Sequence, residues 1–212
     1  MFGFFKRKSL EDDLRENPNQ PEKWLKLAEE NEKKAPEALV NALIFSRGEL
    51  VEQVAKLLKN LAVYRELEPL IPKIEGELGK EYASFFAGMI EEYKGNLQKA
   101  RNLYDVSKNS PNGVLSFLSA YRIASIYEKE GLEELAYKTL KDLEGSVPES
   151  YSLEFSVKKR ELEEKLGLRG SKLFRSFKEG LKKTREALGL SSFGGRTVDE
   201  AFFEELEERL IL

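Results

Sequence analysis

Any catalytic chemistry in this sequence would have to come from carboxylates, lysines or tyrosines, because its 212 residues include no His and no Cys. The sequence therefore lacks an imidazole base, a thiolate nucleophile and the usual zinc ligands. Its 38 Asp and Glu and 35 Lys and Arg are spread along polar stretches such as residues 29–34 and 158–161. That pattern is typical of a solvated helix face with i,i+4 ion pairs. We therefore predict no catalytic residues, no metal ligands and no enzyme activity for this chain.

A loop for nucleotide phosphates would need the pattern G-x-x-x-x-G-K-[ST], in which backbone N–H groups and the Lys surround the phosphates. Gly79 and Lys80 are the nearest approach to it. Glu81 stands where a Ser or Thr hydroxyl would reach the metal, and Ile74 stands where the first glycine would form the tight turn. We predict that these residues bind no nucleotide and no other cofactor.

The composition is that of a soluble, helix-rich chain of one or two domains, with 41% hydrophobic and 34% charged residues, 7 Pro and 15 Gly. The net charge of −3 is small. No basic patch with interleaved aromatic residues runs through the middle of the sequence, so we expect no direct nucleic-acid binding. The lack of Cys suits a cytosolic compartment.

Two stretches of the sequence can be aligned on one another as helical hairpins. Aligning Gly95 with Gly131 also aligns Ala100 with Ala136, at an offset of 36 residues, which is close to the ~34 residues of a tetratricopeptide repeat. In this interpretation small residues let two helices approach closely, and each of the two glycines forms the turn between them. The residues that define the repeat are Trp24, Gly88, Gly95, Ala100, Ala124, Tyr127, Gly131, Ala136 and Pro148.

Further helices are expected upstream of these hairpins. Trp24 resembles a first-helix residue of another unit, although Pro36 interrupts where its turn glycine should be. Residues 37–79 carry at least two more amphipathic helices, and the two prolines of residues 67–72 mark a boundary between helices. We expect an α-solenoid of three to four hairpins over residues 17–166, without strands.

The aromatic residues of this solenoid have two interpretations. They could line a concave groove for a peptide, or they could pack between helices, and packing is the more common role of aromatics at repeat-matching positions. The residues concerned are Trp24, Tyr82, Phe85, Phe86, Tyr121 and Tyr127. We therefore predict a protein-interaction scaffold whose ligand is unknown from the sequence.

The N-terminal segment combines aromatic rings with cations, namely Phe2, Phe4, Phe5, Lys6, Arg7 and Lys8. A signal peptide has the reverse order, with charge before a longer apolar core, and a spanning helix needs ~20 apolar residues. The segment suits an interfacial anchor, whose rings enter the headgroup layer while each cation contributes about 1 kcal/mol against anionic lipid. A frayed terminus explains the composition of these residues equally well.

Two amphipathic segments of opposite charge end the sequence. Residues 171–188 carry a net charge of +4 and residues 197–212 a net charge of −5. Apolar residues recur at helical spacing in both. They are Leu173, Phe174, Phe177, Leu181 and Leu188 in the first segment and Val198, Phe202, Leu206 and Leu210 in the second. Each predicted helix therefore needs a partner for its apolar face.

These two segments resemble the opening of the N domain of the signal recognition particle GTPases, and within them the FtsY-type receptors. The likeness is carried by Phe174-x-x-Phe177-x-x-Gly-Leu181-x-Lys183-Thr184-Arg185-x-x-Leu188 and by Val198-Asp199-x-x-Phe202-x-Glu204-Glu205-Leu206-Glu207. It covers about a fifth of the chain. The resemblance implies the first two helices of a four-helix bundle, and it implies GTP and Mg²⁺ only for a G domain that would follow.

The resemblance also implies a second membrane contact, because receptors of this family have basic amphipathic segments near the first N-domain helix. On this sequence the segment corresponds to Lys172, Leu173, Phe174, Arg175, Phe177 and Lys178. Residues 167–170 just before it look like a short hinge. A helical repeat stands here in place of the disordered acidic stretch common in the family, so the resemblance does not supply the role of the repeat.

The sequence thus predicts an all-α protein with a tetratricopeptide-like solenoid followed by two helices of an incomplete N-domain bundle. Its predicted parts are residues 1–16 for membrane contact, 17–166 for the repeat, 167–170 for the hinge and 171–212 for the bundle helices. We expect a cytoplasmic protein, peripheral at the inner face of the cell membrane, in the co-translational targeting of membrane proteins. Expected partners are an anionic membrane surface, signal recognition particle or translocon proteins and a ligand of the repeat. The alternative is a free-standing tetratricopeptide adaptor without a GTPase link.

Overall fold

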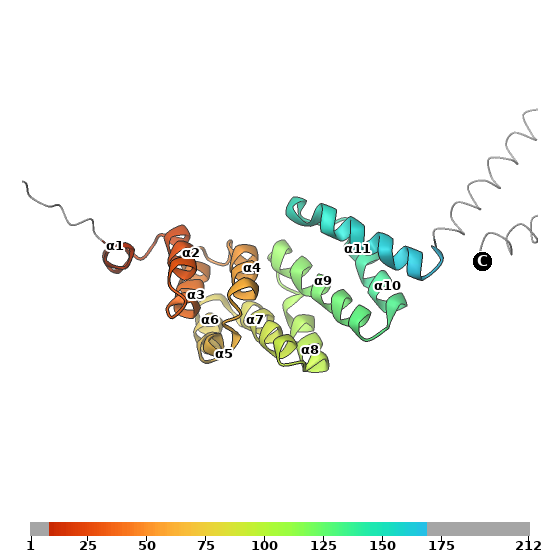
Figure 1. Ribbon diagram of the computed structural model, residues 1–212, viewed down its shortest axis with the longest axis horizontal. Helices are drawn as coiled ribbons and strands as arrows, with labels where there is room; N and C mark the ends of the chain where they lie inside the picture. Colours follow the sequence, from red (N-terminus) through yellow and green to blue (C-terminus); the bar gives the residue numbers. More distant parts are fainter. Residues whose placement is uncertain (1–8, 169–212) are drawn as a thin grey trace, which may run out of the picture. The chain divides into compact units, whose positions relative to one another are not determined.

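Residues 9–168 are described by the computed structural model, and their regular structure is helical throughout (Figure 1). The elements are α1 (Leu10–Glu16), α2 (Pro21–Glu30), α3 (Ala35–Phe45), α4 (Val51–Leu61), α5 (Tyr64–Leu67), the 3-10 helix η1 (Glu68–Leu70), α6 (Ile71–Leu78), α7 (Lys80–Tyr93), α8 (Leu97–Ser107), α9 (Gly113–Lys129), α10 (Glu133–Leu143), the 3-10 helix η2 (Glu149–Tyr151) and α11 (Ser152–Lys165). No strand occurs between residues 9 and 168. The predicted all-α fold class is confirmed.

The chain divides into two compact units, Met1–Tyr151 and Ser152–Leu212. Within the first unit, helices that follow one another along the chain pack in pairs: α2 with α3, α7 with α8, and α9 with α10. The pairs are joined by packing of α3 on α4, α6 on α7 and α8 on α9, and α4 also contacts α9. In the second unit the structure describes α11, which carries the i,i+4 ion pairs Lys159–Glu163 and Arg160–Glu164.

The first hairpin, α2 and α3, begins both of its helices with proline. Pro21 and Pro36 lie in the first turns of α2 and α3, where a missing N–H costs nothing because that group has no partner inside the helix. Pro36 was expected to interrupt the repeat, and in the structure it opens the second helix instead. Trp24 stacks on Phe45 with 6.3 Å between ring centroids, and its indole N–H donates to the Pro18 carbonyl at 2.7 Å.

A short helix that the sequence analysis did not foresee precedes this hairpin. Ser9 caps α1, because its Oγ accepts a hydrogen bond from the Asp12 N–H at 3.1 Å. Leu14 is the only residue of α1 that is fully buried. Ion pairs of Glu11 with Lys34 and of Asp13 with Lys23 join α1 to the first hairpin.

The middle of the first unit is helical, as the sequence predicted for residues 37–79. Residues 37–79 form α4 and α6 in addition to most of α3, with the buried apolar side chains of Val51, Val54 and Leu58 on one face of α4. The proline-containing stretch 67–72 is a boundary as predicted, because α5 ends at Leu67, η1 follows, and α6 starts at Ile71. Pro69 and Pro72 lie in the first turns of η1 and α6, where the missing N–H costs nothing. The residues before them, Glu68 and Ile71, keep right-handed helical φ and ψ.

The hairpins α7–α8 and α9–α10 share the same backbone hydrogen bonds at an offset of 36 residues. Asn96 N donates to Glu91 O at 2.9 Å, and Leu132 N donates to Tyr127 O at 2.8 Å. Gly95 and Gly131 lie between these partners with φ of 82° and 72°, the left-handed conformation that ends a helix in a Schellman motif. One local turn geometry therefore closes both hairpins.

Candidate functional site

Gly88 lets α7 and α8 approach closely. A Cβ atom at Gly88 would lie 2.6 Å from Cε1 of Tyr104, and the Tyr104 side chain is fully buried. Ala100, on the same helix as Tyr104, is also fully buried. Two of the predicted repeat-defining residues, Gly88 and Ala100, thus lie in the tightest part of this hairpin, where a larger side chain has no room.

Glu92 is the centre of a charge cluster that joins three helices. Its carboxylate, 12% exposed, accepts hydrogen bonds from Tyr104 Oη at 2.9 Å, Arg122 Nη1 at 3.0 Å and Lys129 Nζ at 2.7 Å. Tyr104 belongs to α8, and the two cations belong to α9. The Arg122 side chain is 24% exposed. Charge-assisted hydrogen bonds at low exposure are among the stronger polar contacts in proteins, so the cluster fixes α9 against the α7–α8 hairpin.

Protonation in this cluster follows from burial and charge. Burial acts to raise the pKa of Glu92, but Arg122, Lys129 and the Tyr104 hydroxyl together outweigh it, so the pKa lies below the ordinary 4.5. Burial raises the pKa of Tyr104 well above its usual range. At neutral pH the carboxylate is therefore charged, and the phenol retains the proton that it donates to Glu92.

The contribution of Glu92 to stability should be lost in acid. Because the pKa of Glu92 is lowered in the folded chain, its stabilising effect is complete above pH 4.5 and disappears as the pH falls through the folded-state pKa. We expect urea unfolding at a series of pH values to show a gap in unfolding free energy between the wild type and Glu92→Gln that narrows below pH 4.5. A gap that stays constant down to pH 3, about 1.5 units lower, would contradict this assignment.

The neighbouring Glu91 secures the turn between α7 and α8. Its carboxylate is buried and accepts from Asn96 Nδ2 at 2.8 Å, Lys99 Nζ at 3.1 Å and Lys94 Nζ at 3.4 Å. The Asn96 hydrogen bond is the main cause of the lowered pKa of Glu91. Lys94 also pairs with Glu68 of η1 at 2.7 Å, so the turn is attached to the segment between α5 and α6.

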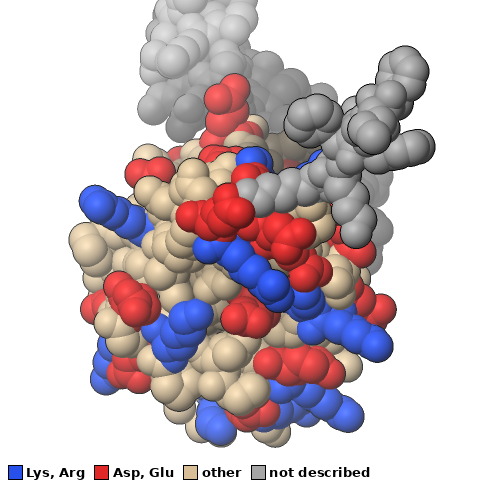
Figure 2. Space-filling model, turned by 90° about the vertical axis from the view of Figure 1, so that its left-hand side faces the viewer, with Lys and Arg blue, Asp and Glu red and all other residues tan. Residues whose placement is uncertain are grey.

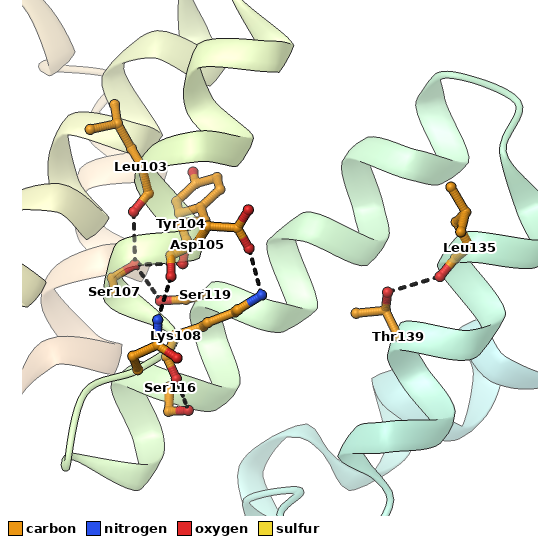
Figure 3. Close-up of polar contacts among 10 residues, drawn as sticks. Leu103, Tyr104, Asp105, Ser107, Lys108, Ser116, Ser119, Leu135 and Thr139 are labelled. Carbon is orange, nitrogen blue, oxygen red and sulfur yellow. Dashed lines mark hydrogen bonds and ion pairs between the residues drawn. The ribbon is translucent and has the colours of Figure 1, made fainter.

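Buried hydroxyl groups join α8 to α9. Ser107 Oγ and Ser119 Oγ lie 2.8 Å apart, and Ser119 Oγ also donates to the Leu115 carbonyl at 2.7 Å. At a more exposed position, Ser116 Oγ donates to the Lys108 carbonyl at 2.6 Å. Figure 3 shows these contacts between the end of α8 and the first turns of α9. Satisfied buried polar groups of this kind fix the register of packed helices.

The predicted aromatic residues divide between packing and partial exposure. Phe85 and Phe86 are fully buried with ring centroids 5.2 Å apart, and Tyr121 is 7% exposed, so these three pack between helices. Tyr127 is partly exposed, and the guanidinium of Arg101 lies 4.9 Å from its ring centroid. The packing interpretation therefore holds for the phenylalanines and Tyr121.

The other predicted repeat residues take different positions. Ala124 of α9 and Ala136 of α10 are fully buried, as expected where helices cross closely. Pro148 precedes η2 in the segment after α10, and its carbonyl accepts from the Tyr151 N–H at 2.9 Å. The cations of the Glu92 cluster were missed, because Arg122 and Lys129 are separated from Glu92 by 30 and 37 residues and resemble ordinary surface charges in the sequence.

The predicted membrane-contact residues lie outside the described part of the chain. They are Phe2, Phe4, Phe5, Lys6, Arg7, Lys8, Lys172, Leu173, Phe174, Arg175, Phe177 and Lys178. Of the helices between residues 9 and 168, none is long and apolar enough to cross a bilayer. The same residues contain no group of three or more acidic side chains that could hold a metal ion. Figure 2 shows Lys and Arg intermingled with Asp and Glu over the face in view, which is typical of a solvated surface.

Comparison with known proteins gives one informative similarity. No family model and no solved structure matches the sequence significantly. The chain is similar to a signal recognition particle receptor. This relative is FtsY of Aquifex aeolicus (strain VF5), 31% identical over 199 residues. The alignment covers 85% of this chain and 42% of FtsY, so the chain spans less than half the length of that relative.

The similarity to FtsY reaches well beyond the two C-terminal segments that first suggested it. Residues outside 9–168 make up about a quarter of the chain, whereas the alignment with FtsY covers 85% of it. Most of the aligned residues must therefore belong to the helices described above. The resemblance to FtsY therefore extends from the C-terminal fifth of the chain into the described helices.

Proposed function

We propose that this chain acts as the membrane-docking and protein-interaction region of an FtsY-like signal recognition particle receptor, in co-translational targeting of membrane proteins. The observation that carries the proposal is the 31% identity to FtsY over 85% of the chain. In this role the helical repeat of residues 17–166 is a tetratricopeptide-like arm for protein ligands, and residues 171–212 begin the N-domain bundle. In this proposal the chain itself has no enzyme activity and no cofactor, and GTP and Mg²⁺ bind only if a G domain follows.

The polar contacts between helices of the first unit support a role as an interaction arm. The Glu92 cluster and the Ser107–Ser119 contact attach α9 to the α7–α8 hairpin through charged and buried polar groups. A scaffold with fixed helix geometry loses little conformational entropy when it binds a partner. Candidate partners are proteins of the signal recognition particle or of the translocon.

Membrane docking is assigned to the two basic aromatic segments, residues 2–8 and 172–178. Each combines Phe rings with at least three cations, and together they give the two signals that stable peripheral binding needs. The proposed location is the inner face of the cell membrane, whose lipid surface is anionic.

Co-sedimentation with vesicles tests this function. The 212-residue chain should bind vesicles that contain phosphatidylglycerol at low salt and dissociate from them at high salt. It should not bind vesicles of pure phosphatidylcholine. Arg175→Glu with Lys178→Glu should weaken binding at least about thirtyfold, because each cation near the surface contributes about 1 kcal/mol.

The matched control reverses two exposed cations of the first unit, Lys59→Glu with Lys80→Glu, and so changes the net charge equally. This control should bind as the wild type does within about threefold. If both double variants lose vesicle binding equally, the loss is explained by net charge and not by the segment at residues 172–178. Absence of binding under every condition would favour the adaptor without a GTPase link.

A further inference from the structure

The end of the first unit lies against two helices that are distant in the sequence. After α10 the chain reaches η2, where Ser150 Oγ donates to Glu52 Oε2 of α4 at 3.1 Å. The adjacent Tyr151 ring has Lys56 Nζ 5.1 Å from its centroid. Glu52 and Lys56 are one helical turn apart and are themselves joined at 2.5 Å. Helix α4 thus contacts two consecutive residues: Glu52 accepts a hydrogen bond from Ser150, and Lys56 lies over the ring of Tyr151.

Helix α9 supplies the apolar side chains that contact Tyr151. Phe117 and Tyr121, also one turn apart, are stacked with ring centroids 5.6 Å apart. The Tyr151 ring lies 5.4 Å from Phe117 and 6.0 Å from Tyr121, tilted against both. These are favourable distances and orientations for aromatic pairs. Tyr151 is only 9% exposed.

The attachment depends on side chains. The backbone hydrogen bond of this turn runs from Tyr151 N to Pro148 O at 2.9 Å and is local. The Ser150 hydroxyl and the Tyr151 ring, by contrast, reach α4 and α9. The contact with the Glu52 carboxylate requires a hydroxyl donor at position 150. The contacts at position 151 require an aromatic ring, whose face meets a cation and which packs on two other rings.

We propose that Glu52, Lys56, Phe117 and Tyr121 form a binding site, which we call the α4–α9 cradle, for a short 3-10 turn in which a hydroxyl residue is followed by an aromatic residue. Its occupant is Ser150-Tyr151 of this chain. Because Ser152 begins the second unit, the filled cradle fixes the place where the chain leaves the first unit. Release of Tyr151 would free residues 144–151, between the end of α10 and Ser152, from these contacts.

Amide hydrogen exchange tests the attachment. In the full chain, Tyr151→Ala and Lys56→Ala should each speed exchange of residues 145–151 by about tenfold, with a much smaller change in α7 and α8. Lys59→Ala, on the same helix and exposed, is the matched control and should change nothing. An equal increase through α7, α8 and α9 would show that Tyr151 is an ordinary core residue, and the proposal would be wrong.

A peptide added in trans tests the binding site. The probe is a synthetic peptide of residues 146–151, and its control carries Ser150→Ala and Tyr151→Ala. A tethered segment has an effective concentration in the millimolar range, so a filled cradle implies a Kd of about 1 mM or lower for the peptide.

Chemical shift changes in NMR spectra of the full-length Tyr151→Ala variant should therefore saturate with the probe and not with its control. The wild type, whose cradle is filled, should show no saturable change. Lack of binding to the variant, or equal binding to both proteins, would overturn the proposal. Neither experiment involves a membrane, so the result is independent of the proposed receptor function.

Discussion

Replacing Glu92 by Ala should lower the free energy of unfolding by about 3 kcal/mol, because removing one partner of a poorly exposed ion pair leaves the opposite charge without compensation. Arg122 is 24% exposed and cannot be fully hydrated in place. The hydroxyl of Tyr104, whose side chain is buried, loses its acceptor as well. Lys129 is 54% exposed, so water can replace the carboxylate there. Urea unfolding followed by circular dichroism measures the change.

The control for this variant is Glu77→Ala. Glu77 is an exposed residue of α6, and its loss should change the free energy of unfolding by no more than about 0.5 kcal/mol. Glu92→Gln should fall between the two, because the amide oxygen still accepts a hydrogen bond but carries no charge. Equal stability of Glu92→Ala and Glu77→Ala would mean that the cluster contributes nothing to the fold.

Two Gly→Ala substitutions inside helices should act in opposite directions. Gly88→Ala should destabilise the chain by about 2 kcal/mol, because overpacking a filled core costs about 1–3 kcal/mol. The new Cβ would lie 2.6 Å from the Tyr104 ring, which is buried and held by Glu92. Gly76→Ala should stabilise it by about 0.5–1 kcal/mol, since alanine favours helix and no atom lies within 4 Å of the new methyl group.

A double variant identifies the cause of the Gly88 effect. If the added methyl group collides with the Tyr104 ring, Gly88→Ala should cost clearly less in a Tyr104→Leu background than in the wild type. Thermal or urea unfolding of the four proteins completes the cycle. Additive effects would place the strain elsewhere in the α7–α8 hairpin, and a stabilised Gly88→Ala would show that the ring moves aside.

Local features of this fold were predictable because each depends on residues close together in the sequence. Gly95 and Gly131 occupy left-handed turns that glycine adopts without strain, so their spacing revealed two hairpins. Pro69 and Pro72 marked the boundary near η1, because a proline removes a backbone N–H locally. Pro36 was interpreted as an interruption and lies instead in the first turn of α3. The buried alanines at positions 100 and 136 could be read from the same alignment.

Features that join distant residues were not predictable from the sequence. In the sequence Glu92 resembles an ordinary surface charge, and only the fold brings Arg122 of α9 beside it. Helix α1 is too short for a recognisable apolar pattern, and its ion pairs to Lys23 and Lys34 exist only once the first hairpin has formed. The contacts of Tyr151 span even more of the chain, as its neighbour Ser150 reaches Glu52 across 98 residues.

The contact between α4 and α9 has a consequence for how the first unit unfolds. In many repeat proteins each repeat touches only its neighbours, so terminal repeats can melt separately from the rest. Here α4 packs on α9, although α5, α6, α7 and α8 lie between them in the chain. Loss of the α9–α10 hairpin would uncover α4 near the opposite end of the sequence. The contact therefore couples early and late helices, and it favours cooperative melting of the unit over stepwise fraying from its ends.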